Sequence, residues 1–298
     1  ACHLLFLLCA PLLHTGHTSA GSSAVTFSWN SGINTASATF SFTFVTVSVT
    51  SLSEVNGPAA GGTAVTVTGT GFQSGHRCKF GTSVATYTFQ SSTAIICGAP
   101  SDTAGSKRAV TVGYTDSNDF TLVGPEFFYV NPPSITSRDP VQGPTGGGTV
   151  ITLVTSALEP QVDLHCYVDS NLVATTRVSL YSVKCAAPSH AAGSATLKLT
   201  YNDVDFSGTT SYTYYTTPSA SSVSPNTGHI TGGMSVTVGG SNFLDGTHMY
   251  CVFGGSFVVD AVYIGTTSAR CITPGHDAGA ISVGISFNGQ EIYNAASY

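Results

Sequence analysis

The chain has 298 residues, of which only 8% are charged, and its formal net charge is −6 with nine Lys plus Arg. So few positive charges leave no basic face that could neutralise phosphates, so a nucleic-acid partner is not expected. No apolar run reaches the roughly 18 to 20 residues that a transmembrane helix needs, so no membrane span is expected in this segment.

The first 45 residues allow two interpretations. "ACHLLFLLCAPLLHTGHTSA" has the apolar core and small-residue end of a secretory signal. However, Cys9 lies 88 residues before Cys97 and, like the later cysteines described below, is followed closely by a proline. Residues 25–30 also match residues 283–288. This period favours residues 1–45 as the C-terminal half of a preceding repeat, with a signal-like segment plus strands as the alternative.

On the half-repeat interpretation, strands from Ala24 to Asn30 and from Phe40 to Val49 would lack partners within this chain. Unpaired strand edges recruit another strand, which predicts assembly with adjoining repeats or with copies of the same protein. The missing half could come in cis or in trans, and the partners of Cys2 and Cys9 stay open.

One glycine-rich pattern occurs three times, as "SEVNGPAAGGTAVTVTGTGF" from Ser53, "DPVQGPTGGGTVITLV" from Asp139 and "SPNTGHITGGMSVTVGGSNF" from Ser224. A glycine-rich loop can cradle a phosphate when a helix opens directly after it. Here a second turn signal follows instead. The glycines therefore indicate sharp turns, where they supply positive φ angles.

Each pattern contains an alternating run, in which Val65 and Val67 alternate with Thr66 and Thr68. Ile151, Leu153, Val236 and Val238 occupy the same positions in the later copies. A period of two predicts strands with buried aliphatic and exposed threonine side chains. About seven short strands per copy, at spacings of about 8 to 12 residues, predict an all-β fold of tandem immunoglobulin-like sandwiches.

Six cysteines form three pairs with nearly constant spacing: Cys78 and Cys97, Cys166 and Cys185, and Cys251 and Cys271. A zinc site normally needs four clustered ligands, and each repeat offers two cysteines. Disulfides are the better interpretation and indicate an oxidising, extracellular or cell-surface location. Each would close a loop of about 20 residues and stabilise its repeat by roughly 3 kcal/mol.

These motifs resemble the IPT/TIG family, the immunoglobulin-like modules of plexins, related receptors and some transcription factors. The resemblance rests on the Gly-Pro and Gly-Gly-Thr-x-Val-Thr-Val opening, the Gly-x-x-Phe turn, "CKFG" and "CVFG", the C-x-x-P strand and the hairpin signal at residues 287–290. It implies repeats at 46–131, 132–217 and 218–298. The middle repeat departs, because Thr155-Ser156-Ala157-Leu158 replaces the Gly-x-x-Phe turn and leaves the shape of that loop open.

Few residues are candidates for metal binding or catalysis. His76, His165 and His248 precede the first cysteines at variable offsets, so exposed strand positions are expected rather than metal ligands. The acid pairs Asp116 with Asp119 and Asp203 with Asp205 offer too few oxygens for calcium. No motif places a catalytic group. We expect no enzyme activity, no cofactor and no metal.

No Asn-x-Ser/Thr sequon occurs, so N-linked glycans are not expected. Clustered hydroxyls near a proline make O-linked sugars the candidate modification. The candidate positions are Thr209, Thr210, Thr213, Thr216, Thr217, Ser219, Ser221 and Ser222.

The composition and the repeats favour a non-enzymatic extracellular structural protein, a segment of a stalk or filament. The alternative is a receptor or adhesin ectodomain that binds a protein or glycan ligand. For such a ligand surface, only Trp29 and the Arg138–Asp139 pair are candidates. A third interpretation, a module beside a carbohydrate-active catalytic domain, would need a catalytic domain that this sequence does not contain.

Overall fold

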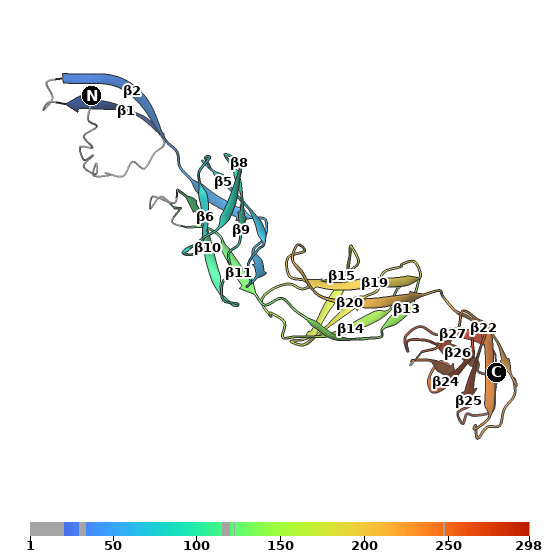
Figure 1. Ribbon diagram of the computed structural model, residues 1–298. Coiled ribbons are helices and arrows are strands. Elements are labelled where there is room, and N and C mark those ends of the chain that lie inside the picture. The colour runs from blue at the N-terminus through green and yellow to red at the C-terminus, as the bar shows by residue number, and fades with distance from the viewer. Residues whose placement is uncertain (1–20, 30–33, 115–119, 122, 247, 298) are drawn as a thin grey trace. The chain divides into compact units, whose positions relative to one another are not determined.

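The computed structural model describes residues 21–29, 34–114, 120–121, 123–246 and 248–297. Every helix or strand element in this part of the chain is a β-strand (Figure 1), which confirms the predicted all-β fold. No described segment forms a helix long and apolar enough to cross a membrane. By its contacts the chain divides into two compact units. The first contains the described residues up to 55 with 60–102 and 106–128, and the second contains 56–59, 103–105 and the described residues from 129 onward.

The first two strands form an antiparallel hairpin. β1 (Gly21–Trp29) pairs with β2 (Asn34–Phe44), from Gly21 opposite Phe44 to Trp29 opposite Asn34. The expectation that these strands lack partners was wrong in this respect, because each is the partner of the other. In the described residues no third strand joins this sheet. The question of a signal segment, and Cys2 and Cys9, lie outside the described residues.

The first repeat contains two sheets. The strand order of the four-stranded sheet is β3 (Ser48–Leu52), β5 (Ala64–Thr70), β9 (Ala94–Gly98), β8 (Thr86–Ser91). The order of the five-stranded sheet is β4 (Asn56–Pro58), β11 (Glu126–Val130), β10 (Lys107–Gly113), β6 (Arg77–Phe80), β7 (Ser83–Val84).

The second repeat has the same two sheets. The four-stranded order is β12 (Ile135–Asp139), β14 (Val150–Thr155), β18 (Ser182–Ala186), β17 (Thr175–Ser179). The five-stranded order is β13 (Gln142–Pro144), β20 (Phe206–Tyr215), β19 (Gly193–Thr200), β15 (His165–Val168), β16 (Asn171–Val173). β13 and β20 run parallel, and the other pairs are antiparallel.

In the third repeat one long strand connects the two sheets. The order is β21 (Ser219–Ser224), β22 (Ser235–Ser241), β25 (Ser268–Ile272), β24 (Phe257–Gly265), β23 (Tyr250–Phe253), β26 (Ser282–Ser286), β27 (Tyr293–Ser297). The first part of β24 pairs with β23 and its second part with β25. Each repeat is thus a sandwich with its core between two layers (Figure 1).

The alternating runs place their aliphatic side chains in these cores. Val65 and Val67 are fully buried, whereas Thr68 is exposed. Ile151, Leu153, Val236 and Val238 are buried in the same way. The buried aliphatic positions are therefore confirmed in all three repeats, because alternate residues of a strand face opposite sides of the sheet. The predicted exposure of the threonines holds for Thr68, whereas Thr66, Thr152 and Thr237 are half-buried.

The Gly-Gly pair and the C-x-x-P motif pack against each other. Gly61 has a φ of 78°, and a Cβ built there would lie 2.7 Å from the main chain of Ala99 and Pro100. The neighbouring Gly62 donates its N–H to Ala99 O at 2.8 Å. Only glycine combines this positive φ with so close an approach of two backbones. The two motifs occur together because they form one contact.

The middle repeat retains the turn that its sequence left open. Leu158 donates its N–H to Leu180 O at 2.8 Å, as Phe72 does to Ser92 O at 3.0 Å and Phe243 to Thr266 O at 2.9 Å. Leu158 is buried, as are the two phenylalanines. Leu158 therefore fills the position of the family's aromatic residue, and the turn has the same hydrogen bond.

Candidate functional site

In the structure the six regularly spaced cysteines are joined within their repeats. Cys78 is bonded to Cys97, Cys166 to Cys185 and Cys251 to Cys271, with Cα atoms 6.2, 6.2 and 6.3 Å apart. All six side chains are buried. In the first two repeats each bridge links the two sheets, from β6 to β9 and from β15 to β18. The bridges are structural, and within the described residues they leave no free thiol.

The three histidines before these cysteines have different surroundings. His76 is only 2% exposed, so the prediction of an exposed position was wrong for it. Its Nδ1 accepts a hydrogen bond from Gln73 N, its ring packs edge-on against Tyr114 at 4.3 Å, and burial lowers its pKa. His165 and His248 are partly exposed and each faces a carboxylate. Within the described residues no three His, Cys, Asp or Glu side chains are grouped to hold a metal.

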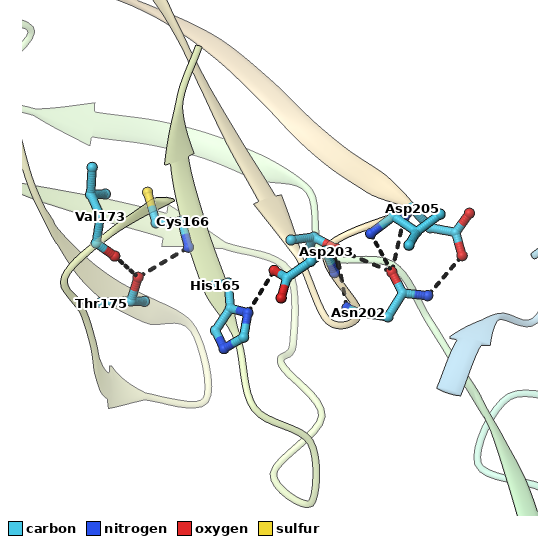
Figure 2. A network of polar contacts seen from close by, with 9 residues as sticks. His165, Cys166, Val173, Thr175, Asn202, Asp203 and Asp205 are labelled. Atoms are coloured by element: carbon cyan, nitrogen blue, oxygen red, sulfur yellow. Dashed lines mark hydrogen bonds and ion pairs between the residues drawn. The ribbon is translucent and has the colours of Figure 1, made fainter. Parts of the chain in front are cut away.

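A network of polar contacts in the second repeat lies in the hairpin between β19 and β20 (Figure 2). Asn202 Oδ1 accepts hydrogen bonds from the N–H groups of Val204 at 3.2 Å and Asp205 at 2.8 Å. Its Nδ2 donates to Asp205 Oδ2 at 2.8 Å. Asp203 has a φ of 62°, a conformation that Asp tolerates better than most residues. The side chain of Asn202 thus holds the turn together.

His165 extends this network from the neighbouring strand β15. Its Nδ1 lies 2.6 Å from Asp203 Oδ1 (Figure 2). Burial first, and then the charge of Asp203, raise the pKa of Tyr167 on the same strand. Thr175 ties β15 to β17, because it accepts from Cys166 N at 3.0 Å and donates to Val173 O at 2.9 Å.

An open groove of about 400 Å³ lies beside His165. Its wall includes Asp163, Thr175 and Arg177. Arg177 donates from Nη2 to Glu159 O and Val162 O at 2.8 and 2.9 Å, so that this nitrogen holds the loop. The hydroxyl of Thr175 is likewise engaged. These polar groups can bind a polar surface, but the groove does not combine a nucleophile with a free base.

The other residues proposed for a ligand surface lie in separate elements, and Arg138 is engaged within its own repeat. Arg138 donates to Thr210 Oγ1 at 2.8 Å and to Ser211 Oγ at 3.1 Å, so it stabilises the sandwich. Asp139 is exposed and lies 3.6 Å from His248 Nε2. Trp29 ends β1. Asp116 and Asp119 lie outside the described residues.

The candidate sugar acceptors are mostly accessible. Seven are exposed: Thr209, Thr213, Thr216, Thr217, Ser219, Ser221 and Ser222. Thr210 is the exception, because it is half-buried and its Oγ1 accepts from Arg138. The hydrogen bond to Arg138 makes Thr210 the poorest of the eight candidates.

The sequence predicted a hairpin at Phe287-Asn288-Gly289-Gln290 but not the hydrogen bonds that its side chains make. Asn288 organises this hairpin as Asn202 does the earlier one, accepting from Gln290 N at 3.0 Å and Glu291 N at 3.2 Å. The available signal was an aromatic residue followed by Asn at the same place in both repeats, Tyr201-Asn202 and Phe287-Asn288.

Comparison with known proteins agrees with this architecture. The family model described as IPT/TIG domain matches residues 48–129, 133–216 and 218–298. Plexin A3 of Danio rerio is 26% identical over 213 residues, which are 66% of this chain and 11% of that protein. Plexin-A2 of Mus musculus is 30% identical over 160 residues, which are 50% of this chain and 8% of that protein. The chain thus spans about a tenth of the length of these relatives.

A solved structure of the full extracellular region of plexin A4 also resembles the chain. It is 19% identical, with a TM-score of 0.41, and the similarity covers 87% of this chain and 22% of that one.

Proposed function

Because the chain belongs to the IPT/TIG domain family, we propose that it is a non-catalytic segment of the ectodomain of a cell-surface receptor related to plexins. The observation that carries this proposal is the run of three consecutive IPT/TIG repeats with plexin relatives. IPT/TIG domains and plexin ectodomains are non-catalytic families. One disulfide in each repeat supports an oxidising, extracellular location.

Within such a receptor the repeats act as a spacer that holds other domains at a distance. The supporting features are structural. Three similar sandwiches follow one another with short connections, such as Thr216 to Pro218, and proline-bearing linkers of this length are semi-rigid. The partly engaged groove beside His165 offers a smaller surface than a protein ligand normally needs.

Surface labelling of cells that make the parent protein tests this location. An antibody against the folded third repeat is expected to label intact cells, and external protease is expected to remove the label. Labelling that requires permeabilised cells would contradict the proposal. An antibody against a cytosolic protein controls for leakage.

A second candidate function, a filament, is favoured by one specific observation. The outer face of β24 carries Val258, Val262 and Ile264, which are 60, 52 and 54% exposed. The neighbouring Ile272 on β25 is 52% exposed. Asp260 and Arg270 are also exposed among these apolar side chains. Since exposed apolar side chains promote association between copies of a protein, the corresponding partner is another copy of this chain.

Sedimentation of the 298-residue chain separates the two functions. A spacer is expected to remain monomeric at micromolar concentrations, whereas a filament grows with concentration. The double variant Val262→Lys and Ile264→Lys abolishes growth if the β24 face is responsible. Concentration-dependent growth of the wild type alone would favour the filament over the spacer.

We further propose that the exposed hydroxyls near Pro218 carry O-linked sugars. With 8% charged residues, the surface needs another source of solubility. Intact mass of the protein secreted by its native cells is expected to exceed the mass of the polypeptide. A mass equal to that of the bare chain would exclude this modification.

A further inference from the structure

The hairpin of the third repeat contacts the second repeat through three side chains, those of Asn288, Gln290 and Glu291, all within the second compact unit. The two hydrogens of Asn288 Nδ2 are shared among three acceptors, Gln142 O at 3.5 Å, Thr149 Oγ1 at 3.3 Å and Glu291 Oε2. Glu291 Oε1 accepts from Thr149 Oγ1 at 2.8 Å, and its Oε2 accepts from Asn288. Thr149 and Asn288 are both buried. The contact is therefore a connected, partly buried network, in which each member fixes the others.

Gln290 adds a contact of a different kind. Its Oε1 accepts from Val150 N at 2.9 Å, and its Nε2 donates to Val150 O at 2.8 Å. The side-chain amide thus pairs with β14 as a residue of an adjacent strand would. In the other direction, Gln142 Nε2 donates to Phe287 O at 3.3 Å.

Aromatic packing supports these polar contacts. Tyr215, at the end of β20 in the second repeat, belongs to the buried cluster of the third repeat. Its ring lies 6.1 Å from that of Phe287, the residue before Asn288. The last residue of β20 thus contributes its ring to the core of the third repeat, next to the residue that precedes Asn288.

The equivalent hairpin of the second repeat makes the corresponding bond. Asn202 Nδ2 donates to Asn56 O at 2.9 Å, and both residues lie in the second compact unit. Asn56 precedes a Gly-Pro pair, as Gln142 does, and both donor–acceptor pairs are separated by 146 residues. The same side chain at the same place in two repeats therefore reaches the same main-chain position of the repeat before it.

We propose that this aromatic–Asn hairpin is a repeat-to-repeat docking element, with Asn202 and Asn288 as its central residues. The Asn side chain uses its oxygen to hold its own turn. It uses its nitrogen to bind the carbonyl that precedes a glycine in the preceding repeat. Docking and hairpin folding are thereby coupled through one amide, so that the second and third repeats move as one body. This role concerns the joint between repeats and holds for a receptor spacer and a filament alike.

The experiment uses the full 298-residue chain and measures two local properties of the joint. One is hydrogen exchange of the Val150 amide, whose acceptor is Gln290. The other is the rate of protease cleavage at the exposed linker residues Thr216 and Thr217. We expect Asn288→Ala to raise both rates by at least about tenfold, because several connected hydrogen bonds are lost together.

Two further variants keep the test decisive. Thr149→Val removes the docking partner on the second repeat without touching the hairpin, so the same rise is expected even if Asn288→Ala unfolds the third repeat. Asn294→Ala, at an exposed position of β27, is the matched control and should change neither rate. Unchanged exchange and cleavage in Thr149→Val would overturn the inference. For the earlier hairpin, Asn202→Ala is expected to speed exchange within residues 56–59, and protection equal to the wild type would limit the docking role to Asn288.

Discussion

The second and third repeats have the same fold but differ in the residues that fill two corresponding places. In the turn after β14 of the second repeat, Leu158 occupies the core position that Phe243 occupies in the turn after β22 of the third repeat. In the hairpin, Val204 stands at the position of Gln290 and is exposed, whereas Gln290 pairs with Val150. The comparison shows that the backbone hydrogen bonds of the repeat are kept, while side chains that fill space or reach a neighbour vary.

The largest expected effect comes from emptying the core position. Phe243→Ala should lower the local free energy of unfolding of β22 by about 4 kcal/mol, because it removes a ring that packs 5.6 Å from Phe287. Leu158→Ala should lower that of β14 by about 3 kcal/mol, because fewer buried atoms are lost. Hydrogen exchange of each strand measures both values. A larger loss of unfolding free energy for Leu158→Ala than for Phe243→Ala would contradict the idea that leucine is the smaller residue at the same core position.

Removing a disulfide should affect the two repeats equally. The loops closed by Cys166–Cys185 and Cys251–Cys271 span 19 and 20 residues. Replacing either pair by alanine should cost about 3 kcal/mol in the chain-entropy model. Thermal unfolding of the two double variants checks whether the two losses of stability are equal. The wild-type chain with its disulfides chemically reduced serves as the reference. A difference of more than about 1 kcal/mol would indicate that local packing, and not loop length, sets the contribution.

A smaller effect is expected from the side chain that distinguishes the two hairpins. Gln290→Ala should lower the stability of the joint by about 1 kcal/mol, because two hydrogen bonds to Val150 are replaced by water. Val204→Ala should change little, since Val204 is exposed. Exchange of the Val150 amide is measured in both variants, and thermal unfolding checks that each variant stays folded. Equal behaviour of the two would mean that Gln290 does not contribute to docking.

The smallest effect concerns pH. Asp169 has a φ of 54° where the third repeat has Gly254 with a φ of 60°. Its pKa is lowered, first by the hydrogen bond from Thr196 N and less by His190. The folded pKa thus lies below the unfolded value of about 3.9. This carboxylate therefore stabilises the repeat above about pH 4, and the contribution disappears as the pH falls through the folded pKa.

Asp169→Gly should make the second repeat less sensitive to acid, as the third already is at this position. The measurement is the melting temperature between about pH 5 and 2. The side chain is 41% exposed, so the difference in slope will be small. Parallel curves for the wild type and the variant would show that Asp169 contributes nothing.

Much of the fold could be predicted because its signals are local. The period-two runs, the paired glycines and the cysteine spacing each act within a few residues or along one loop. The same reasoning failed for His76, which is buried although its neighbours suggest a surface turn. It also failed for β1 and β2, which pair with each other, because pairing depends on which strand is nearest in space.

The sequence by itself determined the all-β class, the three repeats and the cysteines that stand opposite each other. Turn chemistry and alternation act over short distances and are written directly in the residues. Only the tertiary structure decided that Leu158 replaces a phenylalanine, since this depends on the volume left between two sheets. It also decided that Asn202 and Asn288 bind carbonyls 146 residues away, because nothing local to an Asn specifies which distant backbone its second hydrogen bond will meet.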